Sequence, residues 1–93
     1  MYQYKKILVT GKVQGVFFRV SAKEQADKLN LIGFITNQTD GSVYIETYGD
    51  TKDINQFISW CGQGPSVAKV SEVQAESISK FSRPVNGSFS ITA

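Results

Sequence analysis

Residues 5–30 read KKILVTGKVQGVFFRVSAKEQADKLN, and this stretch decides the fold because it joins a strand pattern to a helix pattern. Lys5 to Val13 are rich in β-forming residues, and the run ends in the loop from Gly11 to Gly15, which predicts a strand leading into a turn. From Phe18 to Asn30, small and apolar residues recur at helical spacing, at Phe18, Ala22, Ala26 and Leu29. The stretch therefore predicts a strand, a tight loop and a helix in succession.

A hairpin is predicted after this helix. Gly33 is expected to stop the helix after Leu31, and an extended run then begins at Phe34. This run breaks at Asn37-Gln38-Thr39-Asp40-Gly41, a turn-forming sequence. From Val43 to Tyr48, apolar and polar residues alternate, which is typical of a half-buried strand.

The rest of the chain, from Asp50 onward, predicts a second helix and two more strands. Asp50 or Thr51 can cap a helix whose apolar residues, Ile54, Phe57, Ile58 and Cys61, fall at i, i+3, i+4 and i+7. Gly62, Gly64 and Pro65 are expected to end it. Val70, Val73 and Ala75 indicate a fourth strand, and the alternation around Phe89 and Ile91 indicates a short last one.

The order β-α-β-β-α-β with a terminal strand predicts a ferredoxin-like α+β sandwich, in which two helices cover one face of a mainly antiparallel sheet. The length of 93 residues fits a single domain over residues 1–93. Two strands joined by a helical crossover run parallel, so their carboxyl ends lie at the same edge of the sheet. Arg19 and Asn37 are therefore expected to meet at that edge.

Composition excludes several classes of protein. The formal net charge of +2 argues against a dedicated nucleic-acid binder, and no apolar run is long enough for a signal peptide or a membrane span. Cys61 is the only cysteine, so neither an intramolecular disulfide nor a thiolate metal cluster can form, and we expect it to be buried in the core. We expect a cytoplasmic monomer that acts on a small molecule without a cofactor, a metal ion, a nucleic acid or a membrane.

The junction between the first strand and the first helix is a candidate anion site. Backbone N–H groups at a helix start, together with the helix dipole, favour an anion, and Arg19 adds a permanently charged, bidentate group that suits phosphate. The residues from 1 to 19 include four basic side chains and no acidic one, although such a run is more often only a solvated surface. The candidate residues are Gln14, Gly15, Val16, Phe17, Phe18 and Arg19.

Asn37 is the second candidate, because it lies where the second strand gives way to a turn. Its carboxamide has a donor and an acceptor that can hold one water molecule. On residue type alone an ordinary turn asparagine is the simpler interpretation, since Asn is common in such turns.

Two segments resemble the signatures of the acylphosphatase family. The first is VTGKVQGVFFR, from Val9 to Arg19, and the second runs from Gly33 to Val43 and is followed by Gly49. Ile35 and Thr36 depart from the second signature, where smaller apolar and longer, often basic residues are usual. The resemblance implies a hydrolase of carboxyl-phosphate anhydrides, in which the loop amides and Arg19 hold the phosphoryl group while Asn37 positions the attacking water.

The residue inventory is compatible with this chemistry. There is no histidine, which removes the usual base of serine and cysteine hydrolases. An acyl phosphate needs no proton donor, because its carboxylate leaving group has a pKa of about 4–5. Two alternatives stay open on the sequence: a non-catalytic module that binds phosphate or carbamoyl phosphate, and an RNA-binding domain of the same fold. In the latter, Phe17 and Phe18 would have to lie on central strands to stack on bases.

Overall fold

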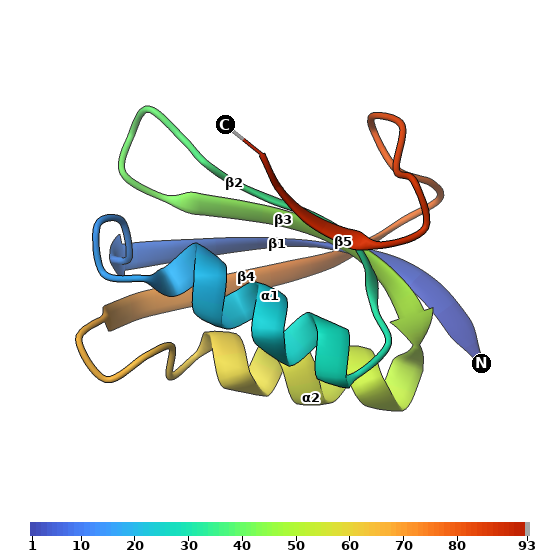
Figure 1. Cartoon of the computed structure of the whole chain (residues 1–93), viewed down its shortest axis with the longest axis horizontal. Helices are drawn as coiled ribbons and strands as arrows, with labels where there is room; N and C mark the ends of the chain where they lie inside the picture. Colours follow the sequence, from blue (N-terminus) through green and yellow to red (C-terminus); the bar gives the residue numbers. More distant parts are fainter. Residues whose placement is uncertain (93) are drawn as a thin grey trace.

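The computed structural model describes residues 1–92 of the chain. It contains two helices and five strands in the predicted order (Figure 1). Their bounds are β1 Tyr2–Lys12, α1 Phe18–Lys28, β2 Ile32–Asn37, β3 Val43–Asp50, α2 Thr51–Cys61, β4 Lys69–Ile78 and β5 Phe89–Thr92. The predicted fold class, a ferredoxin-like α+β sandwich, is confirmed.

The strands form one sheet in the order β4-β1-β3-β2-β5, and both helices cover the same face of it (Figure 1). β3 is antiparallel to β1 and to β2, whereas β2 and β5 are parallel. Because β1 and β2 both oppose β3, they run in the same direction and end at one edge of the sheet. Figure 1 shows the β1–α1 loop and the β2–β3 hairpin together at this edge.

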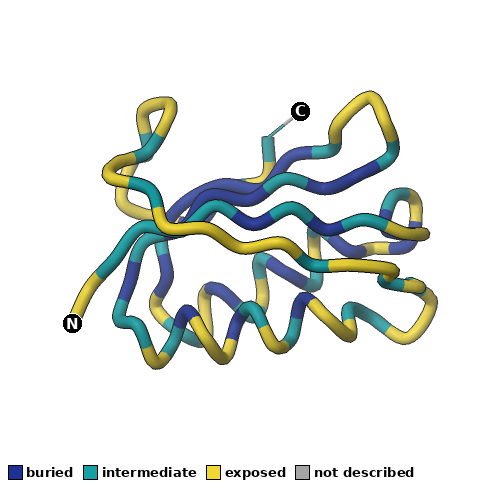
Figure 2. Tube along the Cα trace, turned by 180° about the vertical axis from the view of Figure 1, so that it is seen from behind, coloured by how far each residue is buried: buried dark blue, intermediate teal, exposed yellow. Residues whose placement is uncertain are grey.

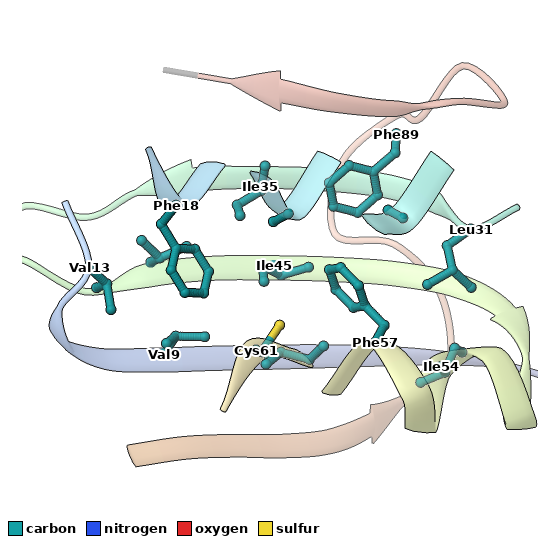
Figure 3. Close-up of a cluster of buried hydrophobic side chains, with 14 of the residues drawn as sticks. Val9, Val13, Phe18, Leu31, Ile35, Ile45, Ile54, Phe57, Cys61 and Phe89 are labelled. Atoms are coloured by element: carbon teal, nitrogen blue, oxygen red, sulfur yellow. The ribbon is translucent and has the colours of Figure 1, made fainter. Parts of the chain in front are cut away.

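The hydrophobic core lies between the sheet and the two helices (Figure 3). Phe18 from α1 and Phe57 from α2 are almost completely buried against sheet residues such as Ile45, and Phe57 meets Phe89 edge to face at 5.9 Å. Figure 2 shows buried and exposed residues alternating along each helix, so that one side of the helix faces the core and the other faces outward. Cys61 is fully buried in this core, as predicted, and burial raises the pKa of its thiol to about 12.

The end of the first helix differs from the prediction. α1 ends at Lys28 rather than continuing to Asn30, and the chain turns at Asn30, which adopts a left-handed conformation with φ of 58°. Asparagine tolerates this conformation better than most residues, so it can end a helix as glycine does. Gly33 instead lies inside β2, where a Cβ atom would collide with the backbone of Glu46 on β3. Its role is close strand packing, not helix termination.

The alternating pattern of β3 also needs a correction, because Glu46 is buried although its position faces away from the helices. Residues of the segment between β4 and β5 cover it. The Glu46 carboxylate accepts hydrogen bonds from the Tyr44 hydroxyl at 2.6 Å, from the Ser82 hydroxyl at 2.6 Å and from the Ser82 N–H at 2.8 Å. The alternation along β3 predicted only which face of the sheet Glu46 lies on. Its burial is due to Ser82, in a segment distant in the sequence.

Burial alone raises the pKa of Glu46, but the hydrogen bonds from Ser82 and Tyr44 and the charge of Arg83 outweigh it, so the net pKa lies below the ordinary value. A carboxyl group whose pKa is lower in the folded state stabilises the protein above its unfolded pKa of about 4.3, and this contribution is lost as the pH falls through the folded value. Glu46 thus stabilises the fold at neutral pH and ceases to do so in acid.

Glu46→Gln is expected to lower the free energy of unfolding by about 1–3 kcal/mol at pH 7, because an amide nitrogen then faces groups that donate hydrogen bonds. Urea unfolding at pH 7 and at pH 3 measures this, and the difference between the two proteins should shrink at pH 3. Glu24→Gln, which removes the same charge from an exposed position on α1, is the control and should have little effect. An equal penalty at both pH values would contradict the role of the ionised carboxylate.

Candidate active site

The loop between β1 and α1 bends sharply at two left-handed residues. Gly15 has φ of 73°, and Phe17, which precedes the first helical residue, has φ of 65° and ψ of 20°. Glycine adopts such angles without cost, but phenylalanine does so at a cost of about 1–3 kcal/mol. Left-handed residues in a tight turn direct neighbouring N–H groups into one concavity, which is a common way to bind an anion. Strained backbone of this kind is often found at functional sites.

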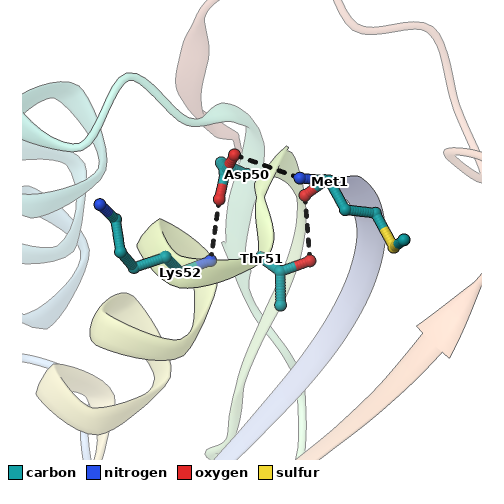
Figure 4. Close-up of polar contacts among 4 residues, drawn as sticks. All are labelled: Met1, Asp50, Thr51 and Lys52. Atoms are coloured by element: carbon teal, nitrogen blue, oxygen red, sulfur yellow. Dashed lines mark hydrogen bonds and ion pairs between the residues drawn. The ribbon is translucent and has the colours of Figure 1, made fainter.

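The start of α1 has no side-chain cap, in contrast to the start of α2. At α2, the Asp50 carboxylate accepts a hydrogen bond from the Lys52 N–H at 3.1 Å and also contacts the amino group of Met1 at 3.4 Å (Figure 4). Asp53 adds a second acidic group in the first turn of α2. At α1, Phe17 makes no side-chain cap and the first turn contains no acidic residue. Neither the cap nor the first turn of α1 thus supplies an anion to the positive end of the helix dipole, which is suited to an external anion.

A cleft of about 260 Å³ lies at this helix start. Arg19 and Asn37 both line it, so the two candidate residues meet at one site although the chain separates them. Arg19 is half-buried and makes no ion pair within residues 1–92, which leaves its guanidinium group available to a ligand. The lining residues are Val13, Gln14, Gly15, Phe17, Phe18, Arg19, Val20 and Asn37.

Asn37 is the last residue of β2 and pairs with Val43 of β3. Its Oδ1 atom is buried and accepts no hydrogen bond from the described residues. A buried oxygen without a partner costs about 1–3 kcal/mol, so such atoms are rare in folded proteins and call for an explanation. Asn37 lines the cleft, so a rotation of its carboxamide would turn this oxygen toward a ligand or a bound water molecule there.

The other candidate residues contribute in different ways. Gly15 and Phe17 line the cleft, and the Phe17 side chain is 74% exposed. Phe18 also borders the cleft, but its side chain belongs to the core. Val16 is buried and does not line the cleft, so only its backbone can serve an anion.

Sequence reasoning missed two lining residues and one contact. Val13 and Val20 flank the candidate residues on either side and form apolar walls of the cleft. Val20 lies three positions after Phe17, a spacing that places both on one side of the helix start and that could have indicated it. The missed contact is that of the Gln14 side chain, which reaches the β2–β3 hairpin, and no signal in the sequence pointed to it.

The described residues, 1–92, contain no group of three His, Cys, Asp or Glu side chains that could hold a metal ion. Neither of the two helices in that part of the chain is long and apolar enough to cross a membrane.

Comparison with known proteins identifies the family. The acylphosphatase family model matches residues 5–91. The chain is 39% identical over 83 residues to an acylphosphatase from Hahella chejuensis. This match covers 89% of this chain and 88% of that protein. It is 46% identical over 70 residues to one from Pelotomaculum thermopropionicum, covering 75% and 76% of the two chains. The crystal structure of acylphosphatase from Bacillus subtilis superposes with a TM-score of 0.88 at 32% identity and covers both chains completely. The chain therefore belongs to the acylphosphatase family of hydrolases.

Proposed function

We propose that residues 1–93 act as one domain that hydrolyses the carboxyl-phosphate anhydride bond of acyl phosphates, giving a carboxylate and inorganic phosphate without a metal ion. The observation that supports this most is that Arg19, Asn37 and four residues of the loop before α1 border one cleft, the four being Gln14, Gly15, Phe17 and Phe18. Membership of the acylphosphatase family supports the same reaction.

The phosphoryl group would bind at the start of α1. Backbone N–H groups from Gln14 to Phe18 would donate to its oxygens, and the Arg19 guanidinium would form two parallel hydrogen bonds with it. These donors are fixed before the reaction, and they face the equatorial oxygens on which charge is concentrated in the transition state. The loop would thus act as a phosphate-binding loop that stabilises this charge.

Asn37 would orient the attacking water. Its Oδ1 atom, which is buried and has no hydrogen-bond donor among residues 1–92, would accept from that water once the carboxamide turns toward the cleft. In-line attack on phosphorus would form one P–O bond as the acyl P–O bond breaks. The acyl group would leave as a carboxylate, which is a weak base and needs no general acid. The water proton would pass to a phosphoryl oxygen, so the products balance without a histidine or another side-chain base.

Hydrolysis of benzoyl phosphate in excess EDTA tests the proposal. We expect release of benzoate and inorganic phosphate at the same rate with and without the chelator, because none of the steps uses a metal ion. Folded protein that bound phosphate but released no product would instead indicate a non-catalytic phosphate-binding module. Activity that disappeared on chelation would contradict the metal-independent mechanism.

A further inference from the structure

The Gln14 side chain crosses from the loop before α1 to the hairpin that follows Asn37. Its Nε2 atom donates to the backbone carbonyl oxygens of Gln38 and Ser42, each at 2.8 Å. Both hydrogens of the amide are therefore used by the hairpin, and neither is left for a phosphoryl oxygen. Only the backbone N–H of Gln14 remains available to the anion.

We infer that Gln14 is a positioning residue that fixes the Asn37 carboxamide relative to the phosphoryl group; this inference rests on the proposed function. The two carbonyl groups bound by Gln14 belong to the first and last residues of the turn that joins β2 to β3. Asn37 directly precedes this turn. Gln14 directly precedes Gly15 of the candidate phosphate-binding loop. Its side chain therefore connects this loop to the turn beside Asn37.

The hairpin turn is closed by several hydrogen bonds of its own. The Gln38 N–H donates to the Ser42 carbonyl at 2.9 Å, and Gly41 N–H donates back to the Gln38 carbonyl at 3.2 Å. The Asp40 carboxylate accepts from the Ser42 hydroxyl at 2.6 Å and from its N–H at 2.9 Å, and these hydrogen bonds lower the pKa of Asp40. Because these hydrogen bonds tie residues 38–42 together, we expect the bonds from Gln14 at the base of the turn to restrain the neighbouring Asn37 as well.

The consequence for catalysis is specific. Reactions of this kind need the reacting atoms aligned, and a displacement of about 1 Å lowers the rate by about 10²-fold. A loosened hairpin would misplace the water held by Asn37 but would leave Arg19 and the loop amides in position. Loss of the Gln14 side chain should therefore lower kcat while phosphate binding persists.

A double-mutant cycle in benzoyl phosphate hydrolysis tests the inference, with inhibition by inorganic phosphate as a second measurement. Gln14→Met keeps the length of the side chain and removes its hydrogen-bond donors. Gln14→Ala removes the donors and most of the side chain. We expect either change to lower kcat about 10- to 100-fold and to change the inhibition constant for phosphate by less than about threefold. In the Asn37→Ala background the same changes should lower kcat by less than about twofold, because there is no longer a carboxamide to position.

The matched control is Gln56→Ala, which removes an exposed glutamine side chain from α2 and should leave all constants unchanged. If Gln14→Ala does not fold, Gln14→Met provides the complete test. Unchanged kcat in a folded Gln14 variant would overturn the inference, and so would an equal loss in both backgrounds, which would indicate an independent role. A parallel loss of phosphate binding would overturn it in favour of a direct phosphate contact.

The failure of this inference can be distinguished from the failure of the proposed function. If the wild-type protein turns over benzoyl phosphate and the Gln14 variants match it, only the positioning role is wrong. If the folded wild-type protein has no turnover, both are wrong.

Discussion

Arg19→Ala is expected to lower kcat/KM for benzoyl phosphate by at least about 10²- to 10³-fold, which corresponds to about 3–4 kcal/mol of transition-state stabilisation. The reason is that Arg19 is a half-buried guanidinium in the wall of the cleft that forms no ion pair within residues 1–92. No carboxylate among those residues pairs with its charge, which is therefore available to a ligand. Steady-state kinetics, with inhibition by inorganic phosphate, measures the effect.

Two further variants separate the geometry of Arg19 from its charge. Arg19→Lys keeps the positive charge but loses the planar pair of donors, so we expect it to recover only part of the activity. Lys12→Ala removes an exposed cation from the end of β1 and should change kcat/KM by less than about threefold, because screened surface charges contribute little. Wild-type turnover by folded Arg19→Ala would remove this residue from the mechanism.

Asn37→Ala is expected to lower kcat by about 10²- to 10³-fold while inhibition by phosphate is retained. The phosphoryl group would still be held by Arg19 and the loop amides, and only the orientation of the water would be lost. The split between kcat and phosphate affinity distinguishes this variant from Arg19→Ala, in which both should change.

The same substitution also makes a prediction about stability. Because the Asn37 Oδ1 atom is buried without a partner among residues 1–92, its removal should leave the free energy of unfolding unchanged or raise it by up to about 1 kcal/mol. Asn55→Ala, at an exposed position of α2, is the control for the loss of an asparagine side chain. A large loss of stability in urea unfolding would contradict this account and would indicate that Asn37 mainly supports the fold.

The fold could be predicted to a large extent because its signals are local. The spacing of Phe18, Ala22 and Ala26 identified the buried side of α1, and the alternation from Val43 to Tyr48 identified the strand of β3. The predicted end of α1 was wrong, because the helix ends at Lys28. Gly33 resembles a helix stop in the sequence, but it is required where β2 and β3 approach each other, a contact that no local pattern contains.

The candidate site was predicted in part. Topology implied that the loop before Arg19 and the end of β2 would share one edge of the sheet, and the structure brings Arg19 and Asn37 to the same cleft. The chemical roles of these residues stay predictions until the kinetic tests are made. The hydrogen bonds that Gln14 makes to the hairpin could not be predicted, because they depend on atomic distances between separate loops.

By itself, the amino-acid sequence determined the order of helices and strands and the residues that face the core, because periodicity and turn chemistry act between residues a few positions apart. Only the tertiary structure decided that Glu46 is buried beneath Ser82, 36 positions away, and that Gln14 binds Gln38, 24 positions away. Hydrogen bonds of this kind require distances correct to a few tenths of an ångström. Such distances are set by the packing of the whole sheet against its helices, and no short stretch of sequence specifies them.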